Sequence, residues 1–77
     1  MFRKILDTIK DETLKITVLK GQVDIINYKE IVSFDDNKII VDCEEMIVNI
    51  IGNNLVINRL LDDEVLVMGE ILRIEFS

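Results

Sequence analysis

Residues 46–57 read MIVNIIGNNLVI, and they show most directly how the chain is built. Residues 46–51 are apolar at nearly every position, as expected for a strand that is covered on both faces. Gly52-Asn53-Asn54 then interrupts the apolar run, and these residue types accept a positive φ at little cost, as hairpin turns require. This segment therefore predicts two antiparallel strands joined by a structural turn at Gly52, Asn53 and Asn54.

The two-residue period continues on both sides of this segment. Apolar rows occur at residues 14–18, 23–25, 31–34, 39–43, 55–57, 65–67 and 72–76. Polar or glycine clusters separate most of these rows, and Gly69 is a further predicted turn. The 77 residues include 14 Ile, 8 Val and 3 Thr but no Ala or Pro, and branching at Cβ favours strands. We expect one all-β domain over residues 13–77, with seven or eight strands in a small antiparallel β-sandwich; a short β-solenoid is the alternative.

Residues 1–12 follow a helical period instead. Phe2, Ile5, Leu6 and Ile9 are spaced to form one apolar stripe, which predicts a short amphipathic N-terminal helix as a leader. We expect this helix to pack on the sheet. Because basic residues accompany the stripe, peripheral contact with a membrane surface is one alternative, and a frayed chain end is the other.

The composition argues against an enzyme. The chain has no His, and its single cysteine, Cys43, provides neither a disulfide pair nor a thiolate zinc site. It contains no Gly-x-Ser-x-Gly elbow and no glycine-rich phosphate loop. We therefore predict no catalytic residue, no cofactor and no metal site. Cys43 ends an apolar row and is followed by two glutamates, so we expect it to be buried and unreactive.

The charge balance limits the kinds of partner. Fifteen acidic and nine basic residues give a net charge of −6, which argues against nucleic-acid binding. No apolar run approaches the ~20 residues of a membrane-spanning helix, and no secretory signal is visible, so we expect a cytoplasmic protein. The acidic clusters at residues 35–37 and 62–64 lack the ligand spacing of a calcium loop, so we expect solvated turns there.

Residues 48–60 and 64–76 carry a recognisable order of glycines and apolar residues. An Ile-x-Gly-x-x-(Leu/Phe)-x-Ile block is followed by Gly-x-Ile and a terminal aromatic residue. The matching positions are Gly52, Leu55, Ile57, Gly69, Ile71 and Phe76. This order resembles the YabP/YqfC family of sporulation proteins, and residues 14–17 and 31–34 are similar to its YqfC-like branch. The resemblance covers residues 14–77.

The resemblance implies a small β-sandwich that endospore-forming Firmicutes make during sporulation, with no established enzymatic activity. Family members are typically expressed in the mother cell, and their genes often neighbour those of membrane proteins needed for the spore envelope. We therefore expect a protein–protein interaction module of spore-envelope formation, located in the mother-cell cytoplasm near the forespore membrane. A sporulation membrane protein is the partner that this resemblance favours.

Tyr28 and Phe34 are the candidate interface residues, because aromatic side chains anchor interfaces well; core packing is their alternative role. Two other functions stay open. Strands that are apolar on both faces also suit a self-assembling structural protein, so a homo-oligomer is one alternative. A carbohydrate- or peptidoglycan-binding module is the other, although the chain has no Trp and a single Tyr to stack on sugar rings.

Overall fold

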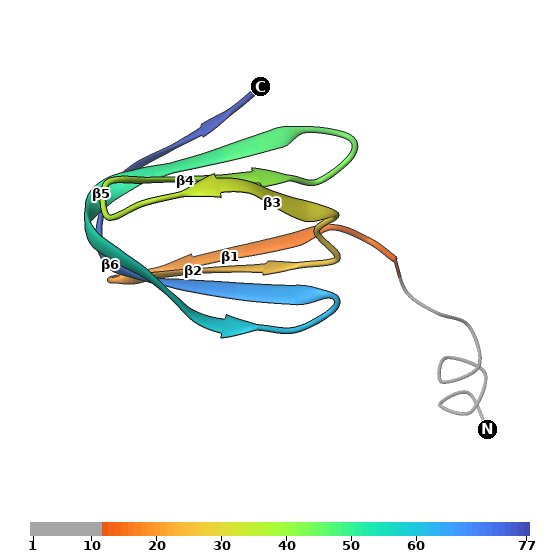
Figure 1. Ribbon diagram of the computed structural model, residues 1–77. Helices are drawn as coiled ribbons and strands as arrows, with labels where there is room; N and C mark the ends of the chain where they lie inside the picture. The colour runs from red at the N-terminus through yellow and green to blue at the C-terminus, as the bar shows by residue number, and fades with distance from the viewer. Residues whose placement is uncertain (1–11) are drawn as a thin grey trace.

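The structure is a computed structural model that describes residues 12–77. These residues form six strands: β1 (Lys15–Leu19), β2 (Gln22–Ile26), β3 (Glu30–Phe34), β4 (Lys38–Asp42), β5 (Ile47–Leu60) and β6 (Glu64–Phe76). The strands make one antiparallel sheet in the order β1-β2-β6-β5-β4-β3 (Figure 1). The prediction of an all-β domain is confirmed. The predicted N-terminal helix falls on residues 1–12, of which all but Glu12 lie outside the described residues.

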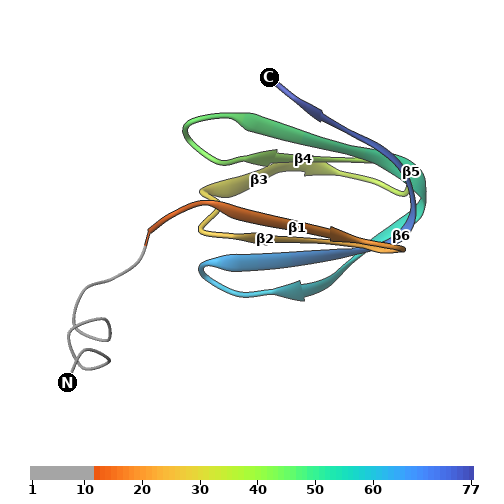
Figure 2. The same cartoon turned by 180° about the vertical axis from the view of Figure 1, so that it is seen from behind.

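The sheet folds back on itself across its two longest strands. β5 has 14 residues and β6 has 13, whereas each of the other strands has 5. Figures 1 and 2 both show β5 and β6 curving at one end of the molecule, so that β3 and β4 lie in one half and β1 and β2 in the other. The halves face each other, but hydrogen bonds through β5 and β6 join them as one continuous sheet rather than as two separate sheets.

The core lies between these two halves. Side chains alternate along a strand, so every second residue of β2, β4 and the N-terminal parts of β5 and β6 points inward. Eight of these inward side chains are fully buried: Val23, Ile25, Ile39, Val41, Val48, Ile50, Val65 and Val67. All eight are β-branched, so the same residues that favour extended backbone also fill the core.

The bend of the sheet falls where the sequence predicts turns. Gly52, Asn53 and Asn54 lie inside β5, and Gly69 lies inside β6, so the predicted hairpin and the predicted turn are wrong. Asn54 and Gly69 do adopt positive φ, at 53° and 143°, but they shift the register between β5 and β6 without reversing the chain. β5 pairs with β6 on both sides of the shift. Residues that favour a turn by their type therefore form bulges within the paired strands.

The strand count follows from this difference. The rows expected at residues 46–51 and 55–57 are continuous as β5, and those at 65–67 and 72–76 are continuous as β6, so six strands replace the expected seven or eight. Every pairing is antiparallel, which is not the arrangement of a solenoid. The acidic clusters do connect strands, as predicted: residues 35–37 join β3 to β4, and residues 61–63 join β5 to β6, although Glu64 of the predicted turn is the first residue of β6.

The turns of the two outer hairpins are hydrogen-bonded to the bend. In the β1–β2 turn, the carbonyl oxygen of Gly21 accepts a hydrogen bond from the amide of Gly69 at 3.1 Å. In the β3–β4 turn, the carbonyl oxygen of Asn37 accepts one from the amide of Gly52 at 3.0 Å. These bonds continue the β2–β6 and β4–β5 pairings by one residue each, and they hold both hairpins at the bent end.

Candidate functional site

The sheet exposes strand edges on both of its halves. Within residues 12–77, β1 pairs with β2 alone and β3 pairs with β4 alone, so each has one edge without a neighbouring strand. Residues 55–60 of β5 pair with β6, but β4 pairs only with the N-terminal part of β5 and leaves their other edge uncovered. Uncovered edges offer backbone donors and acceptors to a further strand.

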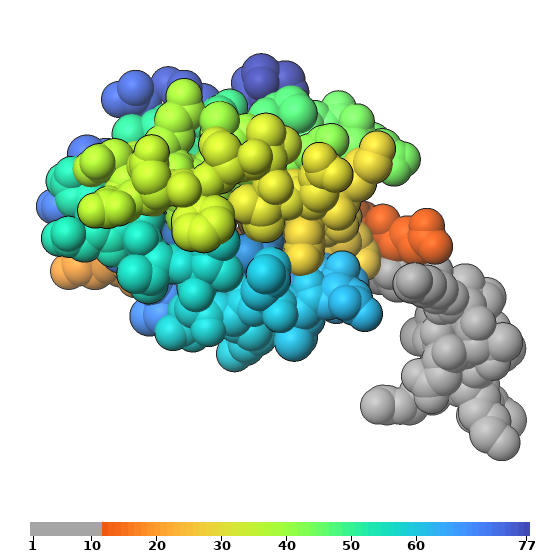
Figure 3. Space-filling view, in the orientation of Figure 1, coloured from red at the N-terminus to blue at the C-terminus, as the bar shows by residue number. Residues whose placement is uncertain are grey.

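An apolar groove lies between two of these edges. It has a volume of about 450 Å³ and is lined by Phe34, Asp35, Asp36, Leu55, Val56, Ile57 and Leu60. Phe34 is 66% exposed, and Val56 and Leu60 are each more than half exposed. Figure 3 shows the side of the molecule on which β3 lies directly above the C-terminal part of β5. Burying these side chains against a partner would remove a large apolar area from water.

The β3–β4 turn fixes the position of Phe34 at one end of the groove. One carboxylate oxygen of Asp35 accepts hydrogen bonds from the amides of Asn37 and Lys38, both at 2.8 Å. The carbonyl oxygen of Asp36 accepts a further bond from the amide of Leu55 at 2.8 Å, which ties the turn to β5. The groove is therefore held by hydrogen bonds within this chain, two to the Asp35 side chain and one between backbone groups, and the two aspartates give its rim a negative charge.

Tyr28 does not belong to this groove. Its ring is half-buried and packs against the core, and its hydroxyl donates a hydrogen bond to the carbonyl oxygen of Leu61 at 2.7 Å. Burial raises the pKa of Tyr28, and the negative charges of Asp62 and then Asp63 raise it further. Of the two aromatic residues proposed for an interface, Phe34 thus lies in the apolar groove, whereas Tyr28 lines a separate pocket.

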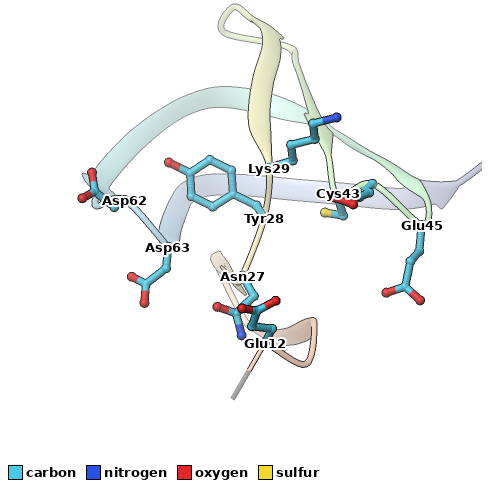
Figure 4. Close-up of a pocket in the computed structure, with 9 residues that line it drawn as sticks. Glu12, Asn27, Tyr28, Lys29, Cys43, Glu45, Asp62 and Asp63 are labelled. Atoms are coloured by element: carbon cyan, nitrogen blue, oxygen red, sulfur yellow. The ribbon is translucent and has the colours of Figure 1, made fainter. Parts of the chain in front are cut away.

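That second pocket has a volume of about 440 Å³ and an acidic mouth (Figure 4). Five acidic residues line it, namely Glu12, Glu44, Glu45, Asp62 and Asp63. Cys43 is 4% exposed, which confirms that it is buried, and its pKa is raised first by burial and then by the charge of Asp42. Among residues 12–77, no three His, Cys, Asp or Glu side chains come together as metal ligands.

A pair of carboxyl groups on β2 and β6 was not anticipated from the sequence. Asp24 and Glu64 are 40 residues apart in the chain, but β2 pairs with the start of β6 and brings them together. The pKa of Glu64 is raised, first by hydrogen bonding with Asp24, then by burial and by the charge of Asp24, while Arg59 acts in the opposite direction. Arg59 contacts Glu64 at 3.2 Å. The pair is a structural feature, because it lines neither of the two hollows.

The groove residues Val56 and Leu60 were also missed as site residues. The sequence does show that their strand is apolar on both faces, which indicates that its outer face is covered by another surface. The pattern does not identify that surface. Which apolar positions remain exposed depends on where the sheet bends.

In the described part of the chain, no helix has the length and hydropathy needed to cross a bilayer.

A comparison with models of known protein families matches residues 10–77 to the YabP family. The chain belongs to this family. Membership points to a sporulation-related protein, and assignment to the YqfC-like branch stays a prediction. No curated protein matches the chain, and no solved structure does.

Proposed function

We propose that this member of the YabP family is a non-enzymatic interaction module in spore-envelope formation, acting on the mother-cell side. In this proposal, the apolar groove between β3 and the C-terminal part of β5 binds a strand or loop of a protein partner. The observation that carries it is the exposure of Phe34, Val56 and Leu60 around one groove of about 450 Å³. Apolar side chains gathered at a preformed groove are typical of protein interfaces.

The rim of the groove favours a particular kind of partner segment. Asp35 and Asp36 line it beside apolar side chains, so a segment with apolar residues flanked by Lys or Arg is complementary to it. The uncovered edge of β3 supplies backbone groups for such a segment if it binds in extended form. This combination supports protein binding over carbohydrate binding.

A matched pair of photo-crosslinking positions tests the proposal. A photoreactive phenylalanine analogue is placed at Val56 in the groove or at Leu72 on β6, which is apolar, 58% exposed and outside the groove. In sporulating cells, we expect a discrete crosslinked protein from Val56 and none from Leu72. Replacing Leu60 by Ser should remove the Val56 product, and replacing Leu72 by Ser should leave it. Equal products from both positions, or none from Val56, would contradict the proposal.

A fluorescent fusion at the native locus tests the cellular part of the proposal. We expect the signal to appear in the mother cell during sporulation and to collect around the forespore. The Leu60→Ser fusion should lose this pattern while reaching the same protein level. A uniform signal in growing cells would overturn the role in spore-envelope formation.

A further inference from the structure

The two outer strands of the sheet carry opposite charge. Residues 15–20, which contain β1, read KITVLK and hold two lysines and no acid. Residues 30–36, which contain β3, read EIVSFDD and hold three acids and no base. Residues 21–77 hold twelve acids and four bases, so the basic edge at β1 stands out against them. Opposite charges on two edges of one molecule make the edges of two copies complementary.

Apolar side chains are exposed on the same two strands. Val18 and Leu19 on β1 are 52% and 57% exposed, and Val32 and Phe34 on β3 are exposed to a similar degree or more. Neighbouring residues of a strand point to opposite faces of a sheet. If a β1 strand from another molecule lies along β3, either Val18 or Leu19 therefore faces the apolar groove, whichever register the two strands adopt. A strand laid there covers Phe34 and the uncovered edge of β3 together.

We propose that the partner in the apolar groove is β1 of a second copy of this chain, paired antiparallel with β3. The antiparallel alignment brings Lys20 beside Glu30 and Lys15 beside the aspartates at the end of β3. This inference rests on the proposed function of the groove as a protein-binding site, and it names the partner. Each copy offers β1 at one end of the sheet order and β3 at the other, so the contact is head to tail.

The charges also disfavour the competing pairings. Two β1 strands side by side would place lysines against lysines, and two β3 strands would place acids against acids. β1 with β3 is the combination in which charge and apolar exposure agree. Because a head-to-tail contact uses different surfaces on the two copies, assembly continues past the dimer unless the rotation between copies closes a ring.

Charge-reversal variants measured by sedimentation and light scattering test this inference. The wild-type protein should rise in average mass with concentration, to about twice the monomer or more, and the rise should weaken with added salt. Lys15→Glu/Lys20→Glu reverses the β1 edge, and Glu30→Lys/Asp36→Lys reverses the β3 edge. We expect each variant to stay monomeric alone, and a 1:1 mixture of the two to regain the mass increase, because reversed β1 then meets reversed β3.

The mixture also controls for misfolding, since only folded variants can restore assembly. Glu45→Lys/Glu75→Lys changes the net charge as much as the β3 variant but lies outside both edges, and it should assemble like the wild type. A wild-type protein that stays monomeric at all concentrations, or a mixture that stays monomeric, overturns the inference. If Val56 nevertheless crosslinks to a different protein, the proposed function stands without it; if Val56 gives no product at all, both fail.

Discussion

Gly52 of β5 lies against the carbonyl group of Glu70 on β6, so closely that a Cβ at position 52 would overlap the carbonyl oxygen. Gly69 is in a similar position, because a Cβ there would lie 2.8 Å from the carbonyl oxygen of Asn54. The two glycines allow β5 and β6 to cross closely at the bend. The bend in turn brings the halves of the sheet together (Figure 1) and places β3 above the C-terminal part of β5 (Figure 3).

Replacing Gly52 by Ala should therefore destabilise the fold strongly. The overlap is with backbone, which cannot rotate away, so we expect the free energy of unfolding to fall by about 3 kcal/mol or more. Gly21→Ala is the matched control: its Cβ meets nothing closer than 3.7 Å, but its φ is +77°, so only the backbone preference of about 1 kcal/mol is lost. Denaturant unfolding measures both, and equal losses would show that the close approach at Gly52 is not a constraint.

The groove residues should contribute little to stability. Phe34 and Leu60 are more than half exposed, so Phe34→Ser or Leu60→Ser should change the free energy of unfolding by no more than about 0.5 kcal/mol. Ile50 is fully buried, and Ile50→Ala should cost about 3 kcal/mol. Thermal and denaturant unfolding check this comparison. A large loss at Phe34 or Leu60 would mean that the groove is part of the core.

The Asp24–Glu64 pair should make stability depend on pH. The pKa of Glu64 is raised in the folded state, chiefly by its hydrogen bond with Asp24, so the folded protein holds the Glu64 proton more tightly than the unfolded chain does. This contribution is fully present below the ordinary glutamate pKa of about 4.3 and is lost as the pH rises through the higher folded value. Glu64→Gln keeps a hydrogen-bond donor without titrating.

Unfolding of the wild type and the Glu64→Gln variant at a series of pH values measures this effect. Relative to the wild type, the variant should gain stability as the pH rises from about 4 to neutrality. Asp24→Ala should flatten the wild-type slope in the same range, because it removes both the hydrogen-bonding partner and the negative charge that raise the pKa of Glu64. Parallel curves for the wild type and Glu64→Gln would show that the two carboxyl groups do not interact.

Tyr28 should ionise above the usual tyrosine range. Burial and the charges of Asp62 and Asp63 raise its pKa, and the chain has no other Tyr and no Trp, so the ultraviolet absorbance of tyrosinate reports on this residue alone. Asp62→Asn should lower the titration midpoint, and Asp42→Asn, which is not among the causes of the shift, should not. A midpoint at the value of free tyrosine would contradict the described surroundings of the ring.

Cys43 should react slowly with thiol reagents in the folded state. It is 4% exposed and its pKa is raised by burial, so both access and the thiolate fraction are low. We expect labelling at least about 100-fold slower than in denaturant, where the thiol is accessible. Because Cys43 is the single cysteine, one rate describes the protein. Equal rates in the two conditions would place the thiol at the surface.

Much of the strand content was predictable from the residues. The alternation of Val and Ile gave correct inward positions in β2 and β4, such as Val23 and Ile39, because a period of two fixes which side chains share a face. The acidic turn at residues 35–37 was also correct, and so was the one at residues 62–64 except that Glu64 already belongs to β6, since Asp and Asn bond to nearby backbone and favour turns in many contexts. The burial of Cys43 followed from its place in an apolar row.

The bend and the groove were not predictable in the same way. The sequence by itself determined an all-β domain, its inward rows and its family, because these depend on local preference and on order along the chain. Tertiary structure alone decided that Asn54 and Gly69 lie at bulges in β5 and β6, because a residue with positive φ suits a hairpin and a bulge equally well until the neighbouring strand is in place. It also decided that Phe34 lines the same groove as Val56 and Leu60, since residues distant in the chain share a groove only after the sheet has folded across that bend.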